Sequence, residues 1–335
     1  MINASYQKFS FSIKVILAVA VLAAISCMAF GIGAAETTLS DVFKAIIGQS
    51  GGEYYEVLRE IRFPRVIAAF FVGSALAAAG AIMQGITRNP LADPGLLGLT
   101  SGANMGLAAA LAFLPAANHL TIMAACFIGS SIAMVFVYGI GASSKNGMTA
   151  FKLVLAGAAV SLFLQAIADG IAILTNLAKD VSMWTAGGLV GTTWSSLVVV
   201  PFIIVGLFIA LALSRHVTIM SLNEEVAIGL GQNTKWLKPV LLMTVVLLAG
   251  AAVALIGNLA FVGLIVPHIV RRWVGSDYRR IIPMAILLGG AFMIFADFAG
   301  RVINAPFETP VVSLVAIIGL PFFLFLVKKG GRNIV

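Results

Sequence analysis

The sequence predicts an all-α protein that crosses a membrane about ten times. Of its 335 residues, 61% are hydrophobic and only 10% are charged, whereas a soluble domain of this length carries about 25% charged residues. Long apolar stretches recur along the whole chain, and most approach the ~20 residues that a helix needs to cross a bilayer. Because these stretches are continuous rather than alternating, a transmembrane β-barrel is excluded.

The predicted spans follow one another along the chain. They are residues 13–34, 66–86, 96–114, 120–141, 151–175, 197–213, 236–257, 259–270, 281–302 and 311–327. The first follows Lys8 and Lys14 and exceeds the roughly 7–15 residues of a signal-peptide core, so we expect a retained span. The eighth is the shortest: about 12 helical residues cover only ~18 Å, so it is either a shortened crossing or a re-entrant helix. The whole chain, residues 1–335, is expected to form a single domain.

The basic residues predict an orientation. If the N-terminus is cytoplasmic, alternating spans place 15 of the 21 Lys and Arg residues inside and leave six outside. The six are Lys44, Arg59, Arg62, Arg65, Lys179 and Arg301. This bias obeys the positive-inside rule, so the net charge of +8 indicates membrane topology rather than affinity for nucleic acid. We therefore expect a multi-pass protein with both termini in the cytoplasm.

Two external segments have amphipathic or polar patterns. Residues 39–48 place Asp41 and Lys44 among apolar side chains and are expected to lie on the membrane surface. A second short external helix is expected around residues 180–185. The lone cysteines, Cys27 and Cys126, lie far apart in apolar runs and form no metal or redox motif.

The cytoplasmic loop 214–235 predicts a short helix that is too polar to cross the bilayer. Ser221 and Glu224 fit a capping box at its start, and Gly229 and Gly231 can end it. Its apolar residues at 222, 226 and 230 fall on one face. Such a helix is either a solvated connector or a knob that inserts into the groove of a partner.

Three external arginines are exceptions to the charge bias. Arg62 and Arg65 flank Pro64, which suits a helix start, and Arg301 lies four residues after the intramembrane Asp297. Cations at such apolar positions need a partner. They either snorkel to lipid headgroups and nearby acids or bind an acidic partner outside the cell.

Several ordered motifs carry a resemblance to a known family. They are RFPR at 62–65, GAIMQG at 80–85, RNPLADPGLLG at 88–98, WTAGGLVG at 184–191, LNEEVAIGLG at 222–231, GLIVPH at 263–268 with Arg271, DFAGR at 297–301 and GLPFF at 319–323. In this order, covering nearly the whole chain, they resemble the permease subunits of iron-siderophore and cobalamin ABC importers.

The resemblance implies a type II ABC importer permease of the bacterial plasma (inner) membrane. Such a permease dimerises, either with itself or with a paralogue, around a central path. It works with two ATPase subunits and with an extracytoplasmic binding protein that delivers an iron chelate. The chain has no Walker A pattern, so ATP would be used by the separate ATPase and this chain would bind no cofactor or metal. It would be a transporter subunit and not an enzyme.

By residue match, the resemblance also implies site residues. Arg62, Arg65 and Arg301 would meet glutamates on the two lobes of the binding protein. Met148 and Thr149 would lie near the cytoplasmic gate, and residues 175–184 near the external gate. The residues that would seat in the ATPase are Ser221, Leu222, Asn223, Glu224, Glu225, Ala227, Gly229, Leu230 and Gly231. Gln84, Asn104 and Ser161 are candidates for weak contacts along the path, with packing as the alternative role for each.

The expected substrate is a ferric siderophore, with haem or cobalamin as the alternatives. Two rival functions start from other features of the chain. Asp169 and Asp297 lie inside spans, as in an intramembrane aspartyl protease, although Arg301 gives Asp297 a partner one turn away. An ion-coupled secondary transporter would show several intramembrane charges and repeat symmetry, whereas the spans here hold few charges.

Overall fold

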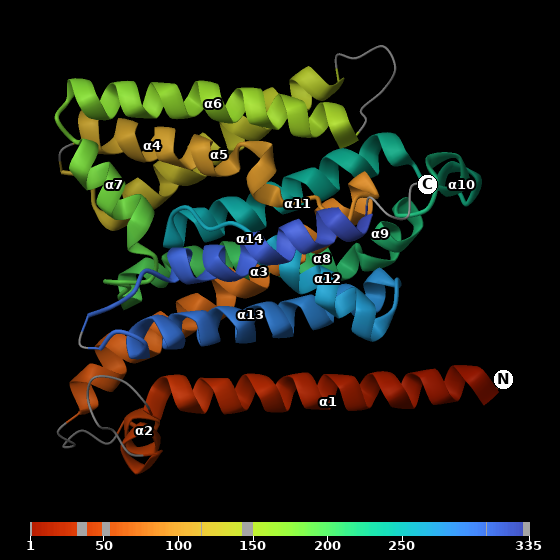
Figure 1. The fold of residues 1–335 in the computed structure, drawn as a ribbon, viewed down its shortest axis with the longest axis horizontal. Coiled ribbons are helices and arrows are strands. Elements are labelled where there is room, and N and C mark those ends of the chain that lie inside the picture. The colour runs from red at the N-terminus through yellow and green to blue at the C-terminus, as the bar shows by residue number, and fades with distance from the viewer. Residues whose placement is uncertain are drawn as a thin grey trace.

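The computed structural model describes residues 2–31, 39–48, 54–114, 116–142, 150–305 and 307–330. Within these ranges every regular element is helical, which confirms the all-α prediction. Most of the long helices run along the horizontal direction of Figure 1, and shorter helices lie near the two ends.

The helices are distributed over the whole chain. They are α1 (Ile2–Gly31), α2 (Leu39–Ile46), α3 (Phe63–Thr87), α4 (Leu99–Phe113), α5 (His119–Ala142), α6 (Ala150–Leu174), α7 (Ala178–Gly187), α8 (Val200–Ala212), α9 (Ser214–Met220), α10 (Glu224–Gly229), α11 (Thr234–Ile256), α12 (Val262–Val274), α13 (Tyr278–Val302) and α14 (Val311–Gly330). A π-helical turn (Val57–Arg62) leads into α3, and 3-10 turns (Pro94–Leu97 and Trp194–Val199) precede α4 and α8.

Within the described ranges, seven segments are long and apolar enough to cross a membrane. They are Phe11–Gly31, Val57–Thr87, Leu120–Ile140, Leu155–Leu174, Trp194–Ala212, Thr234–Ile256 and Tyr278–Val302. Two shorter apolar helices, Leu99–Phe113 and Val311–Leu326, join them. With α12, which has 13 residues, they correspond to the ten predicted spans.

Helix α3 is the central element of the bundle. It packs against α8, α11, α12 and α13, and almost all of its residues between Val66 and Gly85 are buried. Glycines allow the closest approaches: a Cβ atom at Gly73 would overlap the backbone of Gly289 on α13, and one at Gly80 would overlap Gly263 on α12. Small residues at such crossings are typical of helices packed in lipid.

Helices α4, α5 and α6 form a second group beside this core (Figure 1). Gly102 and Gly106 on α4 lie against the backbone of α5. At the opposite edge, α1 packs mainly along α13 and leaves most of its apolar side chains exposed. Exposed apolar side chains are also numerous on α5, α6 and α14, as expected for surfaces that face lipid or a second subunit.

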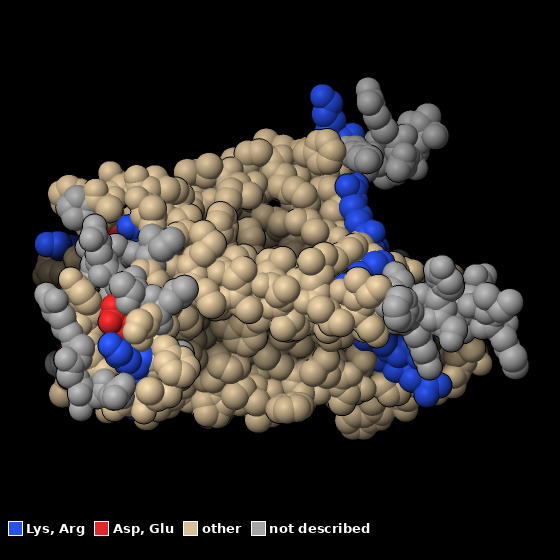
Figure 2. All heavy atoms as spheres, turned by 90° about the horizontal axis from the view of Figure 1, so that it is seen from below, with Lys and Arg blue, Asp and Glu red and all other residues tan. Residues whose placement is uncertain are grey.

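The two ends of the bundle differ in charge. We call the end with α9, α10 and the turn between α12 and α13 the basic end, and the opposite end the α7 end (Figure 1). Figure 2 shows Lys and Arg side chains as a band towards the basic end and a middle zone that is largely free of charged residues. The Lys and Arg residues that the sequence assigns to one side of the membrane therefore gather at one end of the folded molecule.

Candidate transport and coupling sites

Five charged side chains form a cluster at the α7 end, and four of them are largely buried. This arginine cluster consists of Arg62, Arg65, Asp297, Arg301 and Glu308. Arg65 Nε donates to Asp297 Oδ1 at 2.9 Å, and its Nη1 donates to both Glu308 oxygens at 2.8 and 3.0 Å. Arg301 Nε lies 3.2 Å from Asp297 Oδ2. Asp297, only 1% exposed, is thus held between two guanidinium groups.

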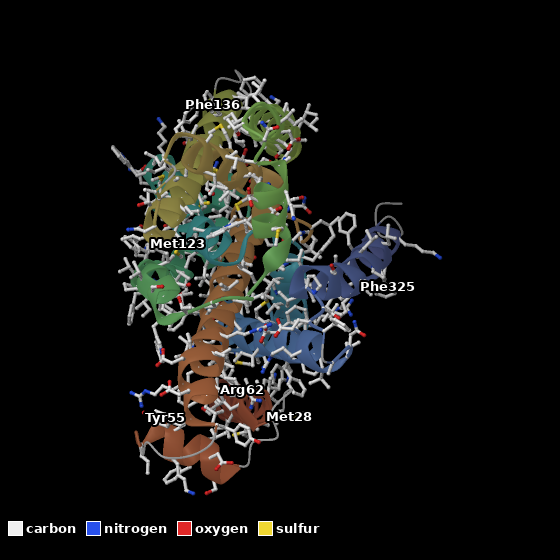
Figure 3. The ribbon with its side chains drawn as sticks, turned by 90° about the vertical axis from the view of Figure 1, so that its left-hand side faces the viewer. Met28, Tyr55, Arg62, Met123, Phe136 and Phe325 are labelled. Carbon is white, nitrogen blue, oxygen red and sulfur yellow. The ribbon has the colours of Figure 1, made fainter. Side chains whose placement is uncertain are left out.

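The same arginines close the end of α1. Arg62 Nη1 donates to the carbonyl of Phe30 at 2.6 Å, and Arg301 Nη2 donates to that of Ala29 at 3.1 Å. These carbonyls belong to the last turn of α1, where the helix leaves its acceptors without partners and carries partial negative charge. Figure 3 shows Arg62 beside the segment that holds Met28. The cluster therefore ties α1, α3 and α13 together.

The structure brings the three predicted arginines together, but their side chains point into the protein interior and not outward. Arg62 and Arg65 are 5% and 8% exposed, whereas the Glu308 side chain is 38% exposed. The partner that the sequence predicted for Asp297, Arg301, is confirmed. Glu308 was missed, because nothing local indicates that the loop after α13 returns to the start of α3.

A pocket of about 450 Å³ opens between α4, α6, α14 and the connection from α11 to α12. Its lining combines polar side chains with apolar ones. The lining residues are Asp93, Gly95, Thr100, Ser101, Asn104, Gln165, Asn258, Ala260, Phe261, Leu264, Leu320 and Phe323. A cavity of this size with a few convergent polar groups is typical of a small-molecule site.

A row of polar side chains leads from this pocket along α6. Asn104 Nδ2 donates to Gln165 Oε1 at 3.2 Å, and Gln165 Nε2 donates to Asp169 Oδ1 at 2.9 Å. We call Asn104, Gln165 and Asp169 the polar row. Asp169 is exposed, and its hydrogen bond belongs to a different network from that of Asp297. The two acids therefore do not form a pair in the structure.

The other two candidates for path contacts occupy different places. Ser161 is partly exposed on α6 and lies against Gly98 at the start of α4. Gln84 is 1% exposed. Its amide donates to the carbonyls of Gly263 and Leu264 at 3.3 Å, and its Oε1 accepts from Arg271 Nη2 at 3.1 Å. In this structure Gln84 joins α3 to α12.

A second pocket, of about 380 Å³, lies at the α7 end. Asp180, Met183 and Trp184 of α7 line it together with Gly188 and Gly191. The expected short helix near residues 180–185 is present as α7, and its surroundings coincide with the region predicted for the external gate. The candidates for the cytoplasmic gate, Met148 and Thr149, lie outside the described residues.

The loop 214–235 holds two short helices instead of one. The predicted capping box of Ser221 and Glu224 is wrong. Ser221 Oγ donates to the Thr218 carbonyl at 2.7 Å as α9 ends, while the Asn223 side chain accepts from the Glu225 amide at 3.3 Å and caps α10. The extended backbone of Asn223 separates the helices, so the cap lies two residues later than predicted.

Helix α10 presents an apolar surface at the basic end. Leu222, Val226, Ile228 and Leu230 are between 46% and 59% exposed, whereas Ala227 is fully buried. Helix α10 ends at Gly229, and Gly231 adopts a positive φ of 81°. A contiguous set of exposed apolar side chains beside a basic band is typical of a surface that binds another protein.

Hydrogen bonds connect this segment to the bundle. Thr218 Oγ1 donates to Asp277 Oδ1 at 3.1 Å and accepts from the Tyr278 amide at 2.9 Å. Arg271 Nη2 donates to the Tyr278 hydroxyl at 2.8 Å and also to Gln84. Burial alone would raise the pKa of Asp277, but hydrogen bonds from Arg279 and Thr218 outweigh it and hold that pKa below its ordinary value. A continuous chain of side-chain hydrogen bonds and one backbone amide therefore connects α9 to α3.

Comparison with known proteins identifies relatives of the whole chain. The FecCD transport family model matches residues 18–329. The iron(3+)-hydroxamate import system permease protein FhuB of Bacillus subtilis (strain 168) is 43% identical, and the alignment covers 92% of this chain and 80% of the relative. The iron-uptake system permease protein FeuB of the same organism is 39% identical, with 90% and 91% covered. FepD of Escherichia coli (strain K12), a ferric enterobactin transport system permease protein, is 35% identical, with 90% and 91% covered.

Solved structures agree with this similarity. An inward-facing metal-chelate type ABC transporter matches with a TM-score of 0.82 and 26% identity, covering 96% of this chain and 99% of that chain. PsaBC from Streptococcus pneumoniae, solved in complex with a Fab, shares the fold with a TM-score of 0.60 and 17% identity, covering 85% of this chain and 94% of that chain. The chain therefore belongs to the FecCD transport family and is a permease subunit of an ABC importer, not an enzyme.

Proposed function

We propose that this permease imports ferric siderophores, with ferric hydroxamates as the first substrates to test. The observation that carries the proposal is the 43% identity, over 92% of the chain, to a permease named for iron(3+)-hydroxamate import. The other two relatives described above are named for iron uptake and ferric enterobactin transport. These names favour ferric siderophores over haem or cobalamin.

The charge distribution supports an orientation for this function. The basic end faces the cytoplasm and the α7 end faces outward, because Lys and Arg are retained on the cytoplasmic side of bacterial membranes. Both termini then lie in the cytoplasm. Transport runs from the α7 end, past the pocket between α4, α6 and α14, to the basic end.

The exposed apolar side chains of α10 support a docking role for the ATPase. Leu222, Val226 and Leu230 would insert into a groove of that subunit, in the helix-in-groove mode. The other coupling residues would shape this knob: Asn223 caps it, and Ala227 anchors it to the bundle. A dimer of permeases would bring two such knobs to two ATPase subunits.

The arginine cluster supports a docking role for the external binding protein, with an exchange of partners. The five members carry three positive and two negative charges, so the cluster favours an additional carboxylate. Glu308 lies on the solvent side of Arg65, at the position that a carboxylate of the binding protein would approach. Docking would then replace the contact of Glu308 with one from the partner, in a bidentate geometry that guanidinium groups favour.

The central path would follow the pocket and the polar row. Asn104 lines the pocket and Ser161 lies on the same helix as Gln165, which supports weak contacts at both positions. Gln84 would act through α12 rather than by touching substrate. Met148 and Thr149 stay proposals for the cytoplasmic gate.

Reconstituted transport tests the proposed function. Proteoliposomes would contain the permease with its ATPase, with the binding protein outside. A radiolabelled ferric trihydroxamate should accumulate only when ATP is inside and the binding protein is present. Uptake of haem or cobalamin under the same conditions, without uptake of the ferric hydroxamate, would overturn the substrate class.

A further inference from the structure

We infer that Asp169 is a specificity-determining residue that selects substrates by charge at the outer part of the path. Rows of polar side chains are common in proteins, but a solvent-accessible carboxylate within an apolar span is not. The segment Leu155–Leu174 has the length and composition of a membrane-crossing helix, and Asp169 lies within it. The inference rests on the proposed function, and it restricts the ferric siderophores of that proposal to those with a suitable charge.

The exposure of Asp169 indicates what it faces. An ionised side chain on a lipid-facing surface of a span is costly, and such groups face water or protein. Gln165, one turn away on α6, lines the 450 Å³ pocket and donates to Asp169 at 2.9 Å. The same face of α6 therefore carries both side chains, and the hydrogen bond holds the carboxylate beside a residue that lines the pocket.

The position of Asp169 places it ahead of the pocket. Helix α6 begins at the basic end and ends at the α7 end (Figure 1). Asp169 lies one turn closer to the α7 end than Gln165. A substrate that enters from the α7 end would reach the carboxylate before the pocket.

The lining of the pocket explains which charge is preferred. Among the described residues that line it there is one carboxylate, Asp93, and there is no Lys or Arg. The amides and hydroxyls of Asn104, Gln165, Thr100 and Ser101 can bind the carbonyl and hydroxamate oxygens of a chelate without a charge. With Asp169 in front, this path favours cationic and neutral ferric chelates and disfavours anionic ones.

A charge series on a single chelate scaffold tests the inference. The probes are a linear ferric trihydroxamate with a terminal ammonium group, its acetylated neutral form and its succinylated anionic form. Uptake is measured in proteoliposomes that contain the complete importer, and each rate is normalised to the affinity of the binding protein for that probe. Wild-type kcat/KM should fall from the cationic to the anionic probe.

The informative variant is Asp169→Asn, because asparagine keeps the size and can still accept from Gln165. The ratio of cationic to anionic uptake should fall by about fivefold or more, since two charges 4 Å apart interact by about 1 kcal/mol even in water. Asp169→Glu should keep the wild-type ratio. Glu56→Gln, an exposed acid just before the π-helical turn that leads into α3, is the matched control for an outer acid and should also keep it.

The outcomes separate the inference from the proposed function. An unchanged ratio in Asp169→Asn, with wild-type uptake of at least one probe, overturns the charge selection and leaves the importer function intact. A wild-type importer that moves none of the three probes overturns the hydroxamate substrate and the inference together. Copurification of the ATPase with each variant shows that the permease has folded and assembled.

Discussion

At the scale of single residues, the arginine cluster combines burial with charge. Asp297 is 1% exposed and has two guanidinium partners, so removal of one partner leaves an incompletely compensated charge in the bundle. We expect Arg65→Met to destabilise the protein by about 3–5 kcal/mol, the usual cost of breaking a buried ion pair. Thermal unfolding in detergent measures this effect.

A double variant separates the charge from the packing. Arg65→Met combined with Asp297→Leu removes both charges and should recover much of the lost stability, as replacement of a buried pair by apolar side chains often does. If the double variant is no more stable than the single one, the cluster does not act through the Asp297 charge.

Glu308 offers a cleaner test of docking than the arginines do. Reversal of Arg62 and Arg65 to Glu would disturb a buried network, so loss of uptake would not isolate docking. Glu308→Gln removes the charge of a partly exposed side chain, while Gln can still accept from Arg65 and the Asp297 contact of Arg65 remains, so the loss of stability should be small. It should tighten binding of the binding protein in a surface-plasmon-resonance titration, because the competing carboxylate is lost. Unchanged or weaker binding would contradict the proposed exchange.

Asp277 provides a prediction on pH dependence. Its pKa is lowered in the folded protein, so its ionised form adds stability above the ordinary Asp pKa, and this contribution is lost as the pH falls through the lowered pKa. Asp277→Asn should therefore lower the unfolding temperature at pH 7, while the difference from wild type should shrink below about pH 4. The effect should be small because Arg279 is exposed and solvent screens the pair. A difference that is constant between pH 7 and pH 3 would contradict it.

Whether a contact can be predicted from the sequence depends on how many residues separate the two partners along the chain. The pair of Asp297 and Arg301 follows from their spacing of four residues on a helix. Arg65 and Asp297 are 232 residues apart, and Thr218 and Asp277 are 59 apart, so these contacts exist only through helix packing. The sequence could indicate that Arg62 and Arg65 need partners, but not which distant residues of the chain supply them.

At the scale of elements, glycines determine how closely the helices approach. A Cβ atom at Gly80 would overlap the backbone of Gly263, so α3 and α12 would have to move apart. We expect Gly80→Ala to destabilise the protein by about 1–3 kcal/mol, the usual cost of overpacking. Gly139→Ala is the control, because a Cβ at exposed Gly139 on α5 meets nothing within 4 Å. Equal unfolding temperatures for the two variants would contradict the close crossing.

Helix α10 shows both what a local pattern predicts and where it fails. The apolar face and the ending glycines were predicted, but the cap was assigned to Ser221, whereas Asn223 caps the helix in the structure. Val226→Asp together with Leu230→Asp should abolish copurification of the ATPase, since both side chains point into solvent. Normal thermal unfolding of this variant would exclude misfolding. If the variant still bound the ATPase, α10 would be a solvated connector and not a docking helix.

At the scale of the whole molecule, hydrophobicity and charge bias predict most of the architecture. The ten apolar stretches all became helices, and even the short eighth one exists as α12. Its start was misplaced by a few residues because Phe261 adopts a positive φ of 71°, which an apolar pattern does not reveal. The sequence likewise cannot show that residues from α4, α6 and α14 enclose one pocket, since that depends on how distant helices pack.

The proposed orientation can be tested on the whole molecule by labelling from one side of the membrane. Cys27 and Cys126 are replaced by Ala, and single cysteines are introduced at two exposed positions, Lys179→Cys on α7 and Ser276→Cys in the turn between α12 and α13. A membrane-impermeant maleimide should label the first in intact spheroplasts and the second only after permeabilisation, because Lys and Arg gather at the end that carries residue 276. Expression controls are provided by labelling in detergent, where both cysteines should react fully. Labelling of residue 276 in intact spheroplasts would reverse the orientation, and with it the direction in which Asp169 and the pocket are encountered.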